Sequence, residues 1–271
     1  MSGFTVDWLT LREPADVAAR SMSITRLAAD SLPPGVVHAL DLATGTGSNV
    51  RCLAPHLPAH QDWLLVDADE RLLAELPERM RRAALPPRAR LETRRVDLSR
   101  LDLAEIVDGR GLVTASALLD LVSDEWIAAV SRLCRRASAV VLFALTYNGR
   151  LDLSPVEPED GRVGALVNRH QRTDKGFGPA LGPDAPARAE DHLARLGYDV
   201  TRAPSDWVLA PDQGELQRQL IDGWAAAATA IEPGEARRID QWRTRRQAHV
   251  AAGRSRLVVG HDDLAGTIRD S

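Results

Sequence analysis

The chain has 271 residues, 44% of them hydrophobic, and a formal net charge of -4 at pH 7. That length and apolar content suffice for the core of one large globular domain, and we expect residues 1–271 to form a single domain. The nearly balanced charge provides no overall field that would draw the protein onto nucleic acid or an anionic membrane, so neither is an expected partner. The expected partner is a small molecule.

Targeting and metal signals are absent from the sequence. The first residues include early acids, and no later stretch approaches the roughly twenty apolar residues of a membrane span. Cys52 and Cys134 lie in predicted helices without the spacing of metal ligands, so neither a metal nor a disulfide is predicted. We expect a cytoplasmic protein of bacterial type, either a monomer or a homodimer.

The first part of the chain reads as a helical cap over residues 1–35. Apolar residues between Pro14 and Ser31 fall on one helical face, and Pro14 suits the first turn of a helix. Pro33 and Pro34 then end the helix. We therefore expect one N-terminal helix ahead of a sheet.

Short apolar runs then alternate with helical patterns, which predicts βαβ units and a doubly wound α/β fold. Five strands are countable before Asn148. The sixth and seventh strands are expected at 198–203 and 256–261, and the last should run antiparallel in a mostly parallel sheet of seven. A Gly- and Pro-rich segment at 148–190 is too long for a tight connection and is interpreted as a lid-like insertion. Two amphipathic helices form a helical insertion at 211–254.

The residues that follow the first three strands carry the clearest chemical signal, because open parallel sheets bind ligands beyond the carboxyl ends of their strands. Asp41 ends the first strand and leads into a small-residue loop, Ala43–Gly47, where the backbone can approach a ligand closely. Asp67 follows the second strand, about twenty residues beyond the loop, where a carboxylate can accept hydrogen bonds from two ribose hydroxyls. Asp97 and Leu98 follow the third strand and can bind the edge and face of an adenine ring.

This ordered set resembles the class I, Rossmann-like S-adenosylmethionine-dependent methyltransferases over roughly residues 40–144. The resemblance implies that the protein binds S-adenosyl-L-methionine, releases S-adenosyl-L-homocysteine and methylates a small molecule. The implied contacts to the methionine end of the cofactor are Asp41, Ala43, Thr44, Gly45, Thr46, Gly47, Asn49 and Ser116. Asp67 and Ala68 would bind the ribose and adenine, and Asp97 with Leu98 the adenine. Ala43 replaces the first loop glycine of the family, so we expect it to keep a negative φ.

The sequence indicates the residues that would bind the methyl acceptor less clearly. Methyl transfer needs alignment, desolvation and, for oxygen or nitrogen acceptors, a group that removes a proton. Asp120, just past the fourth strand, Tyr147, at the end of the fifth, and His170, beside the only lysine, Lys175, are the candidate catalytic residues. The alternative interpretations are a surface acid beside a helix for Asp120, a packing residue with a solvated hydroxyl for Tyr147, and a solvated loop histidine for His170.

Other candidate residues and two alternative functions remain open. Arg12 and Arg20 are candidates to pair with the cofactor carboxylate, and Trp207, Trp224 and Trp242 are interpreted as packing residues. A non-catalytic S-adenosylmethionine-binding protein, using its lid and helical insertion as a partner surface, is the first alternative function. An NAD(P)-binding oxidoreductase is a weaker alternative, because the third glycine of the dinucleotide fingerprint is missing and Asp41 would lie near a pyrophosphate. The fourth strand lacks the Pro-Pro-aromatic motif of amino-directed nucleic-acid methyltransferases, which disfavours base methylation.

Overall fold

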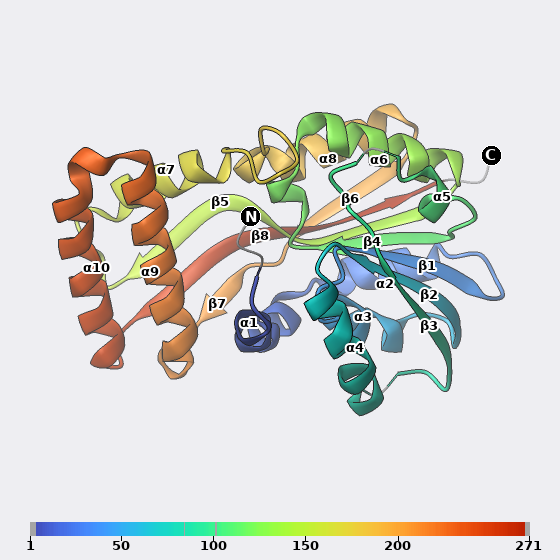
Figure 1. Ribbon diagram of the computed structural model, residues 1–271, viewed down its shortest axis with the longest axis horizontal. Coiled ribbons are helices and arrows are strands. Elements are labelled where there is room, and N and C mark those ends of the chain that lie inside the picture. The colour runs from blue at the N-terminus through green and yellow to red at the C-terminus, as the bar shows by residue number, and fades with distance from the viewer. Residues whose placement is uncertain (1–3, 84, 101, 269–271) are drawn as a thin grey trace.

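The computed structural model describes residues 4–268 apart from 84 and 101. One eight-stranded sheet runs through it in the order β3-β2-β1-β4-β5-β8-β6, and the short strand β7 pairs with β8 (Figure 1). The strands are β1 (Val37–Leu42), β2 (His60–Asp67), β3 (Arg88–Arg95), β4 (Leu112–Ser116), β5 (Val140–Ser154), β6 (Asp199–Pro204), β7 (Trp207–Leu209) and β8 (Arg256–Thr267). Strands β1 to β5 pair in parallel, whereas β8 runs antiparallel to β5, β6 and β7. The predicted doubly wound sheet and its antiparallel last strand are confirmed, and β7 is an addition to the seven predicted strands.

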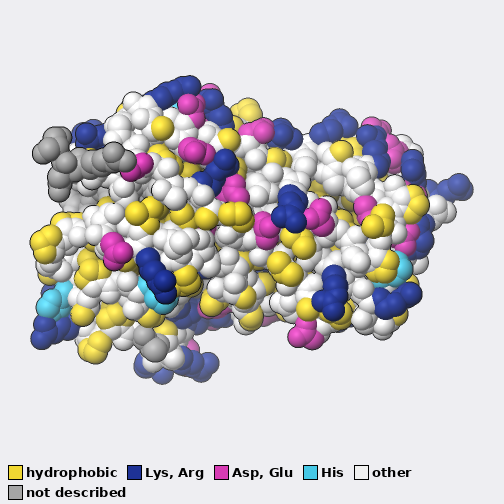
Figure 2. All heavy atoms as spheres, turned by 180° about the vertical axis from the view of Figure 1, so that it is seen from behind, with side chains coloured by type: hydrophobic (Ala, Val, Ile, Leu, Met, Phe, Trp, Pro, Cys, Tyr) yellow, Lys and Arg dark blue, Asp and Glu magenta, His cyan; other side chains and the backbone are white. Residues whose placement is uncertain are grey.

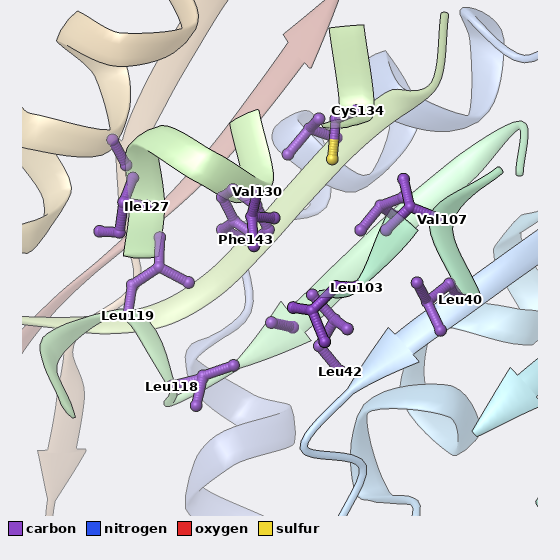
Figure 3. Close-up of a cluster of buried hydrophobic side chains, with 14 of the residues drawn as sticks. Leu40, Leu42, Leu103, Val107, Leu118, Leu119, Ile127, Val130, Cys134 and Phe143 are labelled. Atoms are coloured by element: carbon purple, nitrogen blue, oxygen red, sulfur yellow. The ribbon is translucent and has the colours of Figure 1, made fainter. Parts of the chain in front are cut away.

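Helices cover both faces of the sheet. On one face pack α5 (Ala104–Val107), α6 (Asp124–Arg136) and α8 (Ala185–Arg195), and on the other α2 (Met22–Asp30), α3 (Ser48–Leu53) and α4 (Glu70–Arg82). Figure 3 shows the first of these cores, in which leucines of β1 meet apolar side chains of α5, α6 and β5. All residues of β1 except His38 are buried, as are Leu112 to Ala115 of β4, and the mostly apolar sequences of these two central strands allowed them to be predicted.

The N-terminal region forms two helices where one was predicted. Helix α1 (Val6–Ala19) begins earlier than expected, capped by the Thr5 hydroxyl, which accepts a hydrogen bond from the Trp8 N–H at 3.1 Å. Pro14 therefore lies inside the helix and not in its first turn. Helix α1 ends before Arg20, whose backbone is extended. It ends there because the N–H of Ser21 donates to the buried Asp263 carboxylate at 2.9 Å. A long-range contact, invisible in the local pattern, thus ends α1 and starts α2.

Residues 148–171 and 207–254 build a second layer at the far end of the molecule. Strand β5 continues through 148–154 along β8, and α7 (Asp160–Gln171), α9 (Gly214–Ile231) and α10 (Ala236–Ala251) pack over this extension (Figure 1). Their apolar side chains form a third core with β7 and β8, which includes Tyr147, Trp207 and Trp242. Trp207 and Trp242 are thus packed as predicted, and Trp224 lies at the edge of the same core.

Arginines in α10 have structural partners. Arg246 is fully buried and donates to the Asp160 carboxylate and, at 2.6 Å, to the Pro155 carbonyl oxygen. The indole N–H of Trp242 donates to the same carboxylate at 2.8 Å. On the face shown in Figure 2, basic and acidic side chains are interspersed. No helix within the described ranges is long and apolar enough to cross a bilayer.

Candidate functional site

The loop after β1 has a backbone that only small residues accept. Gly45 and Gly47 have φ values of 56° and 80°, and a Cβ atom on Gly47 would lie 2.0 Å from Met80 Cε. Ala43 has a φ of 53°, so the expectation of a negative φ is wrong. The loop is fixed on both sides of Ala43, because the N–H of Thr44 donates to the Val66 carbonyl at 2.9 Å and its hydroxyl donates to Asp41 at 2.6 Å. Ala43 therefore accepts a left-handed conformation that costs an L-residue about 1 kcal/mol.

Asp41 is fully buried and holds this loop in place. One carboxylate oxygen accepts the Thr44 hydroxyl, and the other accepts the Asn49 side-chain amide at 2.7 Å. Burial raises the pKa of Asp41 to about 6, and the bonds from Thr44 and Asn49 oppose that rise. In this structure Asp41 acts on the loop and on Asn49, and has no exposed surface of its own.

Asp67 and Asp97 end the next two strands on the same edge of the sheet as the loop. Asp67 accepts the Gly45 N–H at 2.8 Å and the Asp69 N–H at 2.9 Å, one on each oxygen. Each oxygen keeps a lone pair for a further donor. Burial raises the pKa of Asp67.

Asp97 is more exposed than Asp67, and hydrogen bonds from the Ser99 hydroxyl and N–H lower the pKa of Asp97. Ala68 is exposed, and Leu98 is buried with its carbonyl accepting the Trp126 indole N–H.

Arg20 joins the N-terminal helices to this loop. Its Nη1 donates to the Asn49 side-chain oxygen at 2.7 Å, and its Nε donates to Asp263 at 3.2 Å. Its Nη2 is buried and has no hydrogen-bond partner among the described residues. A small cavity of about 10 Å³, room for about one water molecule, is lined by Arg20, Asn49, Ser116 and Leu145 among others. A guanidinium nitrogen without a partner can donate a strong hydrogen bond to a carboxylate.

Helix α1 covers the loop. A Cβ atom on Gly45 would lie 3.4 Å from Leu9 Cδ1, and the Glu13 carboxylate pairs with Arg51 of α3 at 2.5 Å. Arg79 of α4 donates to the Thr10 hydroxyl at 2.8 Å. Helix α1 therefore lies against the loop that follows β1, at the edge of the sheet where β1 and β2 end.

Solved structures with this architecture were found, whereas no family model and no curated protein sequence matches the chain. A structure of the cyclopropane synthase MmaA2 from Mycobacterium tuberculosis aligns with 97% of this chain and 95% of its own, with a TM-score of 0.50 and 12% sequence identity. The chain has the class I methyltransferase fold. Two weaker likenesses are to geranyl diphosphate methyltransferase in complex with SAM (12% identity, 91% and 85% coverage, TM-score 0.47) and to the mycolic acid cyclopropane synthase CmaA1 complexed with SAH and CTAB (13%, 91% and 84%, 0.45).

In this methyltransferase fold the acceptor candidates lie near one another. Asp120 is 6% exposed, and burial raises its pKa to about 6 against the opposing effects of its own N–H, the Arg12 charge and the Tyr147 N–H. Tyr147 is buried, and its hydroxyl donates to the Asn168 side chain of α7 at 2.7 Å. Burial and then the Asp120 charge raise the pKa of Tyr147, so the phenol stays neutral.

His170 stands at the edge of this group, near the end of α7. The Nζ of Lys175 donates to the His170 carbonyl at 3.0 Å and lies 3.4 Å from its Nδ1. Burial and the Lys175 charge lower the pKa of His170, and Lys175 in turn feels the charge of Asp120. The structure therefore connects the 170–175 segment to Asp120 electrostatically.

Sequence reasoning missed a second histidine beside Tyr147. The His261 ring on β8 lies 6.1 Å from the Tyr147 ring and 5.1 Å from the Trp207 ring, measured between centroids. Burial, with a contribution from Arg12, lowers the pKa of His261 to about 3, and its Nδ1 has no hydrogen-bond partner among the described residues. A single histidine in a strand pattern gives no local signal that it packs in this group, because its neighbours Trp207 and Tyr147 lie on other strands.

Arg12 and Asp16 of α1 form an ion pair that packs against the Trp207 ring beside His261. Arg12 Nε and Nη2 donate to the Asp16 carboxylate at 2.9 and 3.0 Å, and the guanidinium lies 5.0 Å from the centroid of the Trp207 ring. The Trp207 indole N–H also donates to Asp16, at 3.1 Å. Arg12 is thus paired with Asp16 and packed on Trp207, whereas Arg20 has one buried nitrogen without a hydrogen-bond partner among the described residues.

Proposed function

We propose that the protein is an S-adenosylmethionine-dependent methyltransferase that acts on a small-molecule acceptor. The observation that carries this proposal is the ordered set at one edge of the sheet: the left-handed loop 43–47 after β1, Asp67 after β2 and Asp97 after β3, with Arg20 Nη2 unpaired beside the loop. The loop and Arg20 would hold the methionine end, Asp67 and Ala68 the ribose and adenine, and Asp97 with Leu98 the adenine.

The residues present suit this cofactor. The buried, unpaired Arg20 nitrogen supplies a partner for its carboxylate, and each Asp67 oxygen can still accept a ribose hydroxyl. In this proposal Asp41 positions Thr44 and Asn49 instead of touching the ligand, which differs from the direct contact with the methionine end that the resemblance implies. When bound, the cofactor supplies a methyl group on a positively charged sulfur.

The remaining chemistry would fall to residues beyond the ends of β4 and β5. Asp120 is the proposed proton acceptor, since a buried carboxylate with a pKa of about 6 is ionised at neutral pH and basic enough to take a proton. Tyr147, held by Asn168, would shape the acceptor pocket, and His170 with Lys175 would border its outer side. Segment 148–190 as a lid and 211–254 as a helical support for the pocket remain part of this proposal.

Calorimetric titration with S-adenosylmethionine and S-adenosylhomocysteine tests the proposal. We expect both to bind the wild-type protein, and Asp67→Ala to lose binding by about 100-fold or more, because two hydroxyl contacts to a charged acceptor are removed. Asp69→Ala, which removes the neighbouring capping carboxylate, is the matched control and should retain binding. Failure of the wild-type protein to bind either compound would refute the proposal.

A further inference from the structure

Asp263 on β8 is a fully buried acid that holds two sides of the small cavity beside Arg20. One carboxylate oxygen accepts the Arg20 Nε–H at 3.2 Å and the Ser21 N–H at 2.9 Å, and the other accepts the Leu145 N–H at 2.8 Å. Arg20 and Leu145 both line the cavity. The polar side formed by Arg20 and the apolar side formed by Leu145 therefore depend on one carboxylate.

Arg20 pairs with Asp263 through one nitrogen only. By comparison, the buried Arg246 donates to the Asp160 carboxylate through both Nε and Nη2. Arg20 uses Nε alone, and the second oxygen of Asp263 meets the Leu145 N–H instead. The Nη2 of Arg20 is thereby left buried and without a hydrogen-bond partner in the described part of the chain.

A β-bulge in β5 brings the Leu145 N–H to Asp263. The pairing of β5 with β8 shifts register between Phe143 and Thr146, and Leu145 within this bulge has a φ of 51°. A leucine in this left-handed region is strained, and such a backbone persists where surrounding contacts hold it. Bulges re-aim residues beside functional sites. Here the bulge occupies the Asp263 oxygen that would otherwise complete a two-bond pair with Arg20.

The unpaired Nη2 of Arg20 lacks an acceptor. A buried donor without a hydrogen bond is costly, and the cavity has room for about one water molecule. Val17 of α1 also lines the cavity and is 47% exposed, so the cavity lies close to the molecular surface. A carboxylate that replaces water at Nη2 gains a charge-assisted hydrogen bond, which is roughly twice as strong as a neutral one. A ligand without a carboxylate gains no such bond.

We propose that Asp263 is a positioning residue, which holds Arg20 with Nη2 free for the carboxylate of the methyl donor and so makes the site select donors that carry this group. This inference rests on the proposed function, in which Arg20 meets the methionine end of the cofactor. Asp263 acts through Arg20 and does not touch the ligand. Because Asp263 also accepts the Ser21 N–H, it fixes the backbone between α1 and α2 together with the Arg20 side chain.

The charge of Asp263 and its positioning of Arg20 have opposite effects on carboxylate binding. As a negative charge beside Arg20, Asp263 repels a second carboxylate, so the loss of its charge alone would strengthen binding. As an anchor it keeps Arg20 in place, so the loss of the anchor would weaken binding. Asp263→Asn removes the charge and leaves one acceptor oxygen, whose two lone pairs cannot serve Arg20, Ser21 and Leu145 together. The direction of the change therefore distinguishes the two roles.

Calorimetric titration of the full-length protein compares S-adenosylhomocysteine with its decarboxylated analogue, which keeps the adenosine, the sulfur and the amine. We expect the wild type to bind S-adenosylhomocysteine at least about 10-fold more tightly than the analogue, because the analogue loses the charge-assisted bond to Nη2. In Asp263→Asn this ratio should fall by about 3-fold or more. Asp160→Asn, which removes the charged partner of the buried Arg246, is the matched control and should lower stability but keep the wild-type ratio.

A measurement on the wild type tests the same inference should Asp263→Asn fail to fold. NMR of isotope-labelled arginine side chains, with Arg20 assigned through Arg20→Met, follows hydrogen exchange at each nitrogen. We expect the Arg20 Nε–H to exchange slowly with and without S-adenosylhomocysteine, because it stays bonded to Asp263. The Nη2 protons should slow when S-adenosylhomocysteine binds and not when the decarboxylated analogue binds.

The outcomes separate this inference from the proposed function. Wild-type protein that binds neither compound contradicts the proposed function itself. Three results overturn the inference about Asp263 alone: equal wild-type affinities for the two compounds, a ratio in Asp263→Asn that equals or exceeds the wild-type ratio, or fast exchange of the Arg20 Nε–H in the bound protein.

Discussion

Replacing Asp120 by asparagine should stabilise the unliganded protein. Burial raises the pKa of this carboxyl from 3.8 to about 6, and a rise of about two units corresponds to about 3 kcal/mol of unfavourable free energy when the group is ionised. Because the folded pKa is the higher one, this cost is absent below pH 4, grows as the pH rises toward 6 and is complete above 6. Asparagine keeps the shape and avoids the cost.

Thermal or urea unfolding between pH 4 and 8 measures this effect. The stability gain of Asp120→Asn over wild type should be near zero at pH 4 and reach at most about 3 kcal/mol at pH 7. Asp124→Asn should show the opposite sign at neutral pH, because bonds from Arg188 and His192 lower the pKa of Asp124 to about 2. If Asp120→Asn is no more stable than wild type at pH 7, Asp120 has a structural partner and the reasoning about an unbalanced charge is wrong.

Three other variants probe the loop and its junction with α1. Arg20→Met should lower the free energy of unfolding by about 3 kcal/mol, because it leaves the buried Asp263 without its cation. The control Arg172→Met removes a half-exposed pair with Asp184 and should lower it by less than about 1 kcal/mol. Equal losses of the two variants in urea titrations would contradict this prediction. Ala43→Gly should raise the melting temperature by about 2 °C, because it relieves the left-handed strain, and a lower melting temperature would show that the strain is absent. Gly47→Ala should lower stability by about 2 kcal/mol through its clash with Met80 and Leu76, and unchanged calorimetric unfolding would refute that packing.

The fold and the donor side of the candidate site could be predicted because their signals are local. Strands β1 to β4 alternate with helices. Asp41 and Asp67 lie at the carboxyl ends of β1 and β2, and Asp97 lies two residues after β3, so chain order alone places them on one edge. The conformation of Ala43 could not be predicted, because a hydrogen bond from Thr44 to Val66 of another strand sets it.

The rest of the site depends on contacts between distant residues. Trp207 and Asp16 meet across 191 positions, and Arg20 and Asp263 across 243. Neither pair leaves a spacing that a single sequence reveals. The break between α1 and α2 follows from the contact with Asp263, and His261 meets Trp207 through the pairing of distant strands, which is why the sequence pointed to Asp120, Tyr147 and His170 but not to His261.

The position of α1 has a kinetic consequence. One helix places Leu9 on the glycine loop, leads into Arg20 beside the small cavity and carries Arg12 and Asp16 to the acceptor side. On the proposed function, a cavity of about 10 Å³ is too small for the methionine group of the donor, so we expect α1 to move outward when the donor enters and to carry Arg12 and Asp16 with it. We therefore expect compulsory-order turnover, in which the methyl donor binds first and its product leaves last. Product-inhibition patterns measure this order, and competition between S-adenosylhomocysteine and the acceptor would exclude it.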